Sequence, residues 1–263
     1  MRFLRNVFAY YRAHGRHDLP WRATRDPYKI LVSEVMLQQT QAARVIPKYK
    51  EFLKVFPDIR ILARSPLSSV LTAWSGLGYN RRAKYLHDAA KIVVKKYRGR
   101  IPHDAATLIT LPGVGEYTAS AIRAFAFNQP DVLIETNIRT VFFHLGVRTR
   151  RKIKDEELRP LVEDALRRSR MSPREFYSAL MDYGAYLKAS GVRLNARSRH
   201  YTKQSRFQGS LREVRGAILK TLTARMSTDA TRKRYKNTFE KALVSLVREG
   251  LVERRGSMVH LAR

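Results

Sequence analysis

Cysteine is absent from all 263 residues of the chain. This absence excludes disulfide bonds, thiolate zinc sites and iron–sulfur clusters, because each of them needs sulfur ligands from the protein. The sequence also lacks an apolar run approaching the roughly twenty residues that span a bilayer, and its start lacks the pattern of a signal peptide. We therefore expect a cytoplasmic protein that makes no use of a membrane.

Acidic residues are scarce. The chain has 22 Asp+Glu against 52 Lys+Arg, which gives a formal net charge of +30. Such an excess favours a polyanionic partner, since cations that neutralise phosphates release condensed counterions. Hydrophobic residues make up 44% of the sequence, so the charge belongs to a folded body and not to a solvated tail. The composition predicts a globular protein that binds nucleic acid and associates with the nucleoid.

Strand-like alternation is nearly absent before residue 200, whereas helical periodicity is frequent. Leu67, Val70, Leu71 and Trp74 form an apolar stripe at three- and four-residue steps, and a second stripe lies within 83–94. Prolines separate such segments at intervals suited to short helices. The pattern predicts an all-α body that extends to about residue 200.

The pattern changes after a basic segment at 188–206, which we interpret as a linker or a loop that follows DNA. Amphipathic helices are expected within 211–222 and 239–247, and a strand, a turn and a strand are expected within 249–261. This order resembles a small winged-helix module, a frequent duplex-binding unit. The alternative is a helical cap on the preceding body.

Two motifs point to a specific chemistry. Residues 31–40 read LVSEVMLQQT, with one carboxylate inside an apolar stretch, and residues 111–119 read LPGVGEYTA. In the second motif, glycines allow a tight turn and a close backbone approach, and the following helix begins with amides that can meet a phosphate. An isolated PGVG would be an ordinary turn. Together the two motifs resemble the helix-hairpin-helix DNA glycosylases, and among them the MutY-type adenine glycosylases most closely.

This resemblance covers roughly residues 18–187 and implies a domain organisation. A glycosylase domain at 1–187 would contain a six-helix module at about 27–130 and a second module made of 1–26 and 131–187, with the substrate base entering a cleft between them. A basic linker at 188–206 and a winged-helix-like domain at 207–263 would follow. Relatives usually carry a four-cysteine iron–sulfur loop after a segment like 180–185. The sequence has no cysteine there, so no cofactor is expected, and 207–263 is too short for a Nudix-like domain.

The resemblance also implies four catalytic residues. Glu34 would protonate the departing adenine and later orient water, because cleavage at a purine needs a proton on the base. Glu135 stands where the family places an aspartate that stabilises positive charge on the sugar, and Asn137 would support that carboxylate. Tyr117 stands where strand-cutting relatives carry a nucleophilic lysine, and it would lie against the deoxyribose.

Structural alternatives exist for three of these residues. Glu34 could be an exposed helix residue paired with a nearby base such as Arg44 or Lys29. Glu135 could be a charge favoured at a helix N-terminus, which is compatible with catalysis. Tyr117 could be a core aromatic. Asp182, another acid in this region, is assigned to a structural role as a helix or turn partner.

DNA-contacting residues are implied in three segments. Extruding a base requires a group that fills the vacated stack, and Gln38, Gln39 and Tyr79 match the wedge elements of the family, although Tyr79 could be plain core. The hairpin would contribute its backbone through the following residues: Leu111, Gly113, Val114, Gly115 and Thr118.

The sequence therefore predicts a monofunctional, monomeric glycosylase. It would bind double-stranded DNA that contains a mismatch or an oxidised base, and it would release adenine mispaired with 8-oxoguanine or guanine to leave an abasic site. A G·T or G·U mismatch thymine/uracil glycosylase is the enzymatic alternative. A non-catalytic protein that binds DNA damage or unusual DNA structure is the alternative from another class. A lyase that uses a different lysine is a third possibility.

Overall fold

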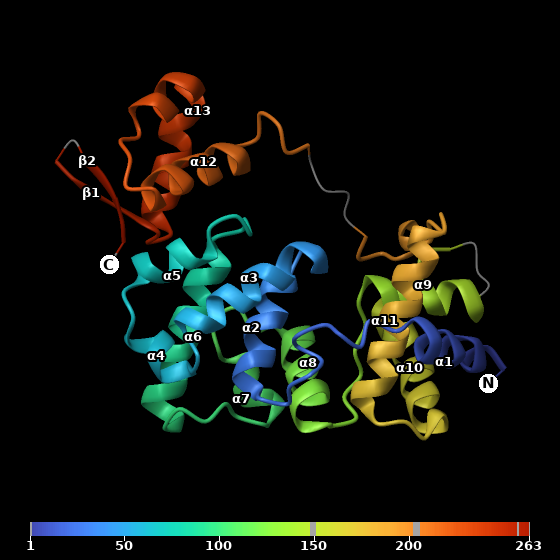
Figure 1. Ribbon diagram of the computed structural model, residues 1–263. Helices are drawn as coiled ribbons and strands as arrows, with labels where there is room; N and C mark the ends of the chain where they lie inside the picture. Colours follow the sequence, from blue (N-terminus) through green and yellow to red (C-terminus); the bar gives the residue numbers. More distant parts are fainter. Residues whose placement is uncertain (1, 148–150, 202–205, 257, 263) are drawn as a thin grey trace. The chain divides into compact units, whose positions relative to one another are not determined.

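The computed structural model describes residues 2–147, 151–201, 206–256 and 258–262. Apart from one two-stranded sheet near the C-terminus, its regular structure is helical (Figure 1), which confirms the predicted all-α class. In the described part of the chain, no helix is long and apolar enough to cross a membrane. The chain divides into two compact units, and each is described by itself.

The first unit comprises Met1–Ile30, His103–Ile109 and Val114–Lys203. Helix α11 is at its centre and packs against α1, α8, α9 and α10. Its core is aromatic, with Phe142, Phe143, Phe176 and Tyr177 all at most 3% exposed. The elements of this unit are α1 (Arg2–His14), α7 (Ala105–Ile109), α8 (Glu116–Phe127), α9 (Thr136–Leu145), α10 (Asp155–Ser169), α11 (Pro173–Ala189) and the 3₁₀ turn η1 (Asn195–Arg197).

The second unit comprises Leu31–Pro102, Thr110–Gly113 and Gln204–Arg263. The apolar stripe predicted around Trp74 is buried in its core, where Trp74 lies edge-on to Phe52 with ring centroids 5.9 Å apart. Its elements are most of α2 (Pro27–Leu37), then α3 (Ala42–Val55), α4 (Ile59–Arg64), α5 (Leu67–Trp74), α6 (Arg81–Tyr97), α12 (Leu211–Thr223), α13 (Asp229–Arg248), β1 (Val252–Arg255) and β2 (Met258–Leu261).

The C-terminal segment has the predicted order of two helices and a hairpin. α12 packs on α13, and β1 pairs with β2 in antiparallel register, with Val252 opposite Leu261. The segment also contacts the preceding helices of its unit, since α12 and β2 both pack on α5. It therefore combines the winged-helix-like order with the packing expected of a helical cap.

The segment after α11 is held by protein contacts. The backbone amide of Ile153 donates to the carbonyl oxygen of Arg197, and the amide of Arg199 donates back to Ile153. Thr140 on α9 donates its hydroxyl to Asn195 of η1 at 3.1 Å. Within the predicted linker 188–206, residues 202–205 lie outside the described residues. The predicted domain boundaries stay predictions. The two compact units are divided differently from the predicted modules, since residues 103–109 and 114–130 group with the N-terminal segment.

Candidate functional site

Glu34 lies inside α2 and is 8% exposed. Its neighbours Val32, Val35 and Met36 are at most 2% exposed. The alternative of an exposed helix residue is therefore wrong, and Glu34 is a carboxylate held in an apolar stretch as the motif predicts. Glu34 belongs to the second unit, together with Gln38, Gln39 and Tyr79, whereas Glu135, Asn137 and Tyr117 belong to the first.

Two loops of the second unit are tied together by the guanidinium of Arg82. Its Nη1 donates to the carbonyl oxygens of Val35, Met36 and Gln38 at 2.9, 2.8 and 2.6 Å. Its Nη2 donates to Gly78 at 3.0 Å, and also to Leu77 and to the Thr40 hydroxyl. One buried cation thus caps the end of α2 and fixes residues 38–40 against residues 77–78.

Burial lowers the pKa of Arg82 to about 10. Since that value is still well above neutral pH, Arg82 remains charged and keeps all its donors. Sequence reasoning missed this residue, because an arginine near the start of a helix is usually a surface charge. The signal that could have found it is the Gly-Leu-Gly loop just before it, whose carbonyls need a donor if the loop is buried.

The wedge candidates Gln39 and Tyr79 both have left-handed backbones, with φ of 55° and 48°. Non-glycine residues adopt this conformation at a cost, and it often accompanies a functional constraint. Tyr79 is half-buried and Gln39 is exposed, so the alternative of Tyr79 as plain core is not what the structure has. The hydrogen bonds from Arg82 to the carbonyls of Gln38 and Gly78 hold the backbone next to both residues.

The hairpin motif is supported at Gly113 and corrected at Gly115. Gly113 has φ +76°, and a Cβ there would lie 2.8 Å from Cβ of Tyr85, so a side chain does not fit. Gln38 donates to the Gly113 carbonyl at 3.3 Å, which joins the hairpin to the 38–40 loop. Gly115 has an ordinary φ of −89°, and a Cβ there would meet nothing within 4 Å. The tight turn that the motif predicts therefore depends on Gly113 alone.

The remaining hairpin residues are buried. Leu111, Val114 and Thr118 are 2%, 3% and 4% exposed. Their side chains are packed inside the protein, so the predicted contact of these residues with DNA would have to be made by backbone atoms. Gly115 is the N-cap of α8 and supplies no side-chain hydrogen bond to the first turn of that helix. Tyr117 is half-buried and packs on the core of the first unit, so its predicted place against the deoxyribose stays a prediction.

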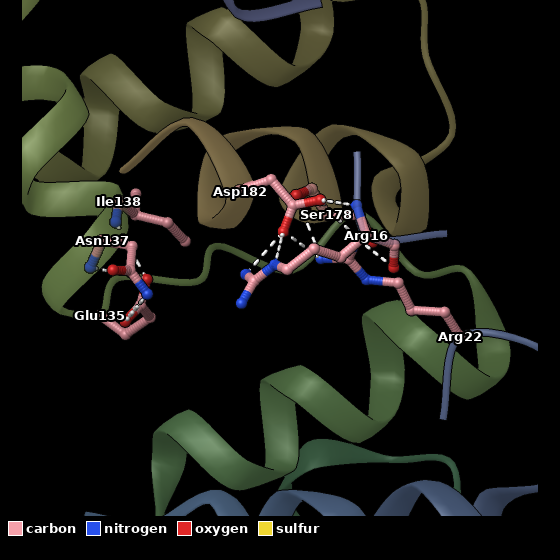
Figure 2. Close-up of polar contacts among 7 residues, drawn as sticks. All are labelled: Arg16, Arg22, Glu135, Asn137, Ile138, Ser178 and Asp182. Atoms are coloured by element: carbon pink, nitrogen blue, oxygen red, sulfur yellow. Dashed lines mark hydrogen bonds and ion pairs between the residues drawn. The ribbon is translucent and has the colours of Figure 1, made fainter. Parts of the chain in front are cut away.

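Glu135 is the N-cap of α9 in the first unit. Its Oε1 accepts hydrogen bonds from the backbone amides of Asn137 and Ile138 at 2.8 and 3.0 Å, and its Oε2 accepts one from Asn137 Nδ2 at 3.2 Å (Figure 2). Glu135 therefore lies at a helix N-terminus, and Asn137 contacts its carboxylate. The side chain folds back onto the first turn of its own helix, and the catalytic roles of both residues stay predictions.

Burial and local contacts act in opposite directions on the Glu135 carboxyl group. Burial raises its pKa above the usual 4.5, although the two backbone amides and the charges of Lys188 and Arg139 act in the opposite direction. Burial in turn lowers the pKa of Lys188, and Glu135 opposes that shift. Each of these two groups therefore favours the charged form of the other.

The start of α9 is set by a close approach of α11. A Cβ at Gly184 would lie 2.3 Å from the backbone oxygen of Asn137, which is far below an ordinary contact. Glycine at this position is therefore what allows α11 to reach the first turn of α9. The position of the Glu135 carboxylate depends on that contact.

Asp182 on α11 binds two arginines of the N-terminal segment. It accepts from the backbone amide and Nε of Arg16 at 2.8 and 2.7 Å, and from both Nη atoms of Arg22 at 2.6 and 2.9 Å (Figure 2). Burial opposes ionisation, yet the hydrogen bonds and charges of these arginines hold the pKa of Asp182 below its usual value. This network agrees with the structural role assigned to Asp182, and it fixes the segment after α1 to α11.

An iron–sulfur cluster does not fit this chain, because no cysteine is present to supply thiolate ligands. The segment that follows α11 is stabilised by its contacts with Ile153 and Thr140 instead.

Comparison with known proteins gives a consistent result. Residues 32–167 match the family model described as "HhH-GPD superfamily base excision DNA repair protein". The chain is 38% identical over 190 residues to the adenine DNA glycosylase of Buchnera aphidicola subsp. Baizongia pistaciae, an alignment that covers 70% of this chain and 52% of that protein. The chain thus spans about half the length of several curated relatives that it matches.

Another relative aligns along nearly its whole length. The adenine DNA glycosylase of Mycolicibacterium smegmatis is 33% identical over 269 residues, covering 91% of this chain and 89% of that protein. Among solved structures, a thermostable thymine-DNA glycosylase is 27% identical with a TM-score of 0.60, covering 76% of this chain and 94% of that one. A trapped endonuclease III–DNA covalent intermediate, at 20% identity and a TM-score of 0.55, covers 79% and 88% and shows the fold alone.

The first prediction concerns Arg82. Replacing it by methionine leaves the carbonyls at the end of α2 and in the 77–78 loop without their donor, at about 1–3 kcal/mol for each buried group left unpaired. We expect Arg82→Met to lower the free energy of unfolding by about 3 kcal/mol or more in urea titrations. The control is Arg44→Met, at an exposed position on α3, which should change it by less than about 0.5 kcal/mol. Equal effects of the two substitutions would contradict the role of Arg82.

The second prediction concerns Gly184. Gly184→Ala forces α9 and α11 apart, so we expect a loss of about 1–3 kcal/mol in the free energy of unfolding, as for other overpacked sites. Gly216→Ala is the matched control, because Gly216 is also helical and an added Cβ there meets nothing within 4 Å. That variant should gain about 0.5–1 kcal/mol from helix propensity. Thermal or urea unfolding measures both, and a neutral Gly184→Ala would show that the close approach is dispensable.

Proposed function

Because the chain belongs to the HhH-GPD superfamily of base excision DNA repair proteins, we propose that it is a DNA glycosylase that releases adenine mispaired with 8-oxoguanine or guanine. Its partner is double-stranded DNA, on which it acts as a monomer. Adenine as the released base is supported by relatives named adenine DNA glycosylase, one of which aligns over 89% of its length. The observation that carries the chemistry is the Glu135 carboxylate, which two backbone amides and Asn137 hold in place.

The reaction needs an acid for the base. Glu34, inside the buried stretch of α2, donates its proton to a ring nitrogen of adenine while the bond between the base and the sugar carbon breaks. The electron pair of that bond leaves with the protonated base. Glu34 is then ionised and accepts a proton from the attacking water, whose oxygen bonds to the sugar carbon. The products are adenine and an abasic site, and the enzyme returns to its starting state.

The sugar develops positive charge as the base departs, and a fixed anion stabilises that charge. Glu135 supplies the anion. Its hydrogen bonds with the start of α9 orient the carboxylate before substrate arrives, so no reorganisation is needed during the reaction. The backbone amides of Asn137 and Ile138 and the charge of Lys188 favour the ionised form of this carboxylate against the effect of burial.

Tyr117 supports a reaction without strand cleavage. A strand-cutting enzyme of this kind needs an amine that attacks the sugar carbon, and a phenol at this position cannot form a Schiff base. The abasic product should therefore remain intact until alkali is added.

A thymine or uracil glycosylase acting on G·T or G·U pairs is the second candidate. It is favoured by one observation, the 27% identity to a structure titled as a thermostable thymine-DNA glycosylase. Single-turnover incubation with duplexes containing A opposite 8-oxoguanine, A opposite G, T opposite G and U opposite G separates the two. Alkali-dependent breaks only at adenine support the first candidate, whereas breaks at T or U support the second. Binding without breaks in any duplex would indicate a non-catalytic protein.

The third prediction tests Glu34. Glu34→Gln removes the transferable proton and should lower the single-turnover rate of adenine release by about 100-fold or more, since general acid catalysis contributes about 10²–10⁴-fold. Affinity for the duplex should change little. Glu51→Gln is the control, because Glu51 is an exposed carboxylate on α3. Full activity of Glu34→Gln would remove Glu34 from the mechanism.

The fourth prediction is a pH dependence set by Glu135. Its pKa is raised above 4.5 in the folded protein, so the anion is lost as pH falls through that higher value. We expect the single-turnover rate to decline on the acid side with a midpoint above pH 4.5.

The free energy of unfolding should depend on pH in the opposite direction to the rate. A carboxyl whose folded pKa is raised stabilises the fold below its unfolded pKa and loses that contribution as pH rises through the folded pKa. The free energy of unfolding of Glu135→Gln, relative to the unmodified protein, should therefore increase from pH 4 to pH 7 while activity is lost. A pH-independent difference would show that Glu135 titrates as an ordinary glutamate.

A further inference from the structure

Tyr79 is held by two arginines that come from distant parts of the second unit. The guanidinium carbon of Arg82, at the start of α6, lies 5.4 Å from the centroid of the Tyr79 ring. The guanidinium carbon of Arg212, in the first turn of α12, lies 5.5 Å from the same centroid. Arg212 also donates from Nη1 to the Tyr79 hydroxyl at 2.7 Å, across 133 residues of sequence. The ring and the hydroxyl of Tyr79 are therefore both bound.

The C-terminal segment that supplies Arg212 is anchored beside this loop. Glu249, at the end of α13, pairs with Arg215 of α12 and with Arg81 of α6. The Glu249 side chain is 7% exposed, and despite its burial the hydrogen bonds from Arg215 and Arg81 lower its pKa to about 2. This pairing connects α12 and α13 to the residue next to Arg82. Arg212 thus projects from a helix whose position relative to α6 is fixed.

We propose that Arg212 is a positioning residue for base extrusion: it holds the Tyr79 ring in the orientation that enters the base stack. The inference rests on the proposed function, in which Tyr79 fills the place of the extruded base. The C-terminal segment then contributes to base extrusion, because its Arg212 orients the Tyr79 side chain before DNA binds.

Charge and conformation both support this role. A tyrosine with φ of 48° depends on its surroundings to stay in place, and a hydrogen bond on its hydroxyl fixes the direction of the ring. Arg212 itself is stacked over Phe207, with its guanidinium carbon 5.4 Å from that ring centroid, so its own freedom is reduced. Ordering the wedge before DNA binds removes an entropic cost from the extrusion step.

The test compares Arg212→Met with Lys220→Met in the full chain. Each substitution removes one positive charge from α12, but Lys220 is exposed at the other end of the helix. Three quantities are measured: affinity for an undamaged duplex, the fluorescence change of 2-aminopurine placed beside the target adenine, and the single-turnover rate of adenine release. We expect Arg212→Met to slow extrusion and adenine release by about tenfold, with the same affinity for undamaged duplex as Lys220→Met.

A double-mutant cycle tests whether Arg212 acts through the Tyr79 hydroxyl. If Arg212 acts through the Tyr79 hydroxyl, combining Arg212→Met with Tyr79→Phe slows adenine release by less than the product of the two separate effects. Arg212→Lys keeps the charge without the planar donor, so its rate of adenine release should lie between those of the unmodified protein and Arg212→Met. It replaces Arg212→Met in the test if urea titrations show that Arg212→Met is unfolded.

Several outcomes would overturn the inference. Rates equal to those of Lys220→Met would show that Arg212 does not position the wedge. A parallel loss of affinity for undamaged duplex would make Arg212 a general phosphate contact. Faster release would mean that the contact restrains Tyr79. In each case the unmodified protein still releases adenine, whereas absence of release by the unmodified protein would instead overturn the proposed function.

Discussion

The last carbonyl groups of a helix have no partner within that helix, and when the helix end is buried something else must donate to them. At the end of α2 the donor is the guanidinium of Arg82, which also binds the carbonyls of the loop that precedes α6. Glu34, Gln38 and Tyr79 all lie within a few residues of these carbonyls. The geometry of the Glu34 segment and of the loops that carry Gln38 and Tyr79 therefore depends on one buried cation. Its charge is retained because its lowered pKa of about 10 is still far above neutrality.

In the first unit the unsatisfied backbone groups are the amides at the start of a helix, and an acidic side chain accepts from them. The amides at the start of α9 donate to the Glu135 carboxylate, so the hydrogen bonds that cap the helix also fix the position of that side chain. The close approach at Gly184 sets how near α11 lies to α9, and Asp182 fixes the segment after α1 to the same helix. The capping hydrogen bonds hold the carboxyl group and lower its pKa, whereas its burial raises the pKa and outweighs them.

The fold class and the burial of Glu34 could be predicted because they follow from local periodicity. The stripe around Trp74 and the apolar neighbours of Glu34 are visible within one or two helical turns. The contacts of Arg82 could not be predicted, because its acceptors at Val35 and Thr40 lie 47 and 42 residues earlier in the chain. The backbone angles of the hairpin could not be predicted either: the motif shows which residues are glycine, but only the structure shows that Gly113 has a positive φ and Gly115 does not. The contact between Arg212 and Tyr79 spans 133 residues and leaves no local pattern.

The left-handed backbones of Gln39 and Tyr79 have an evolutionary consequence. Glycine adopts that conformation without steric cost, so at both positions a change to glycine would relieve strain. The two positions differ in what glycine would remove: Gln39 is exposed, whereas the Tyr79 side chain is held by Arg82 and Arg212. A library screened only for thermal tolerance should therefore accept glycine more readily at position 39 than at position 79.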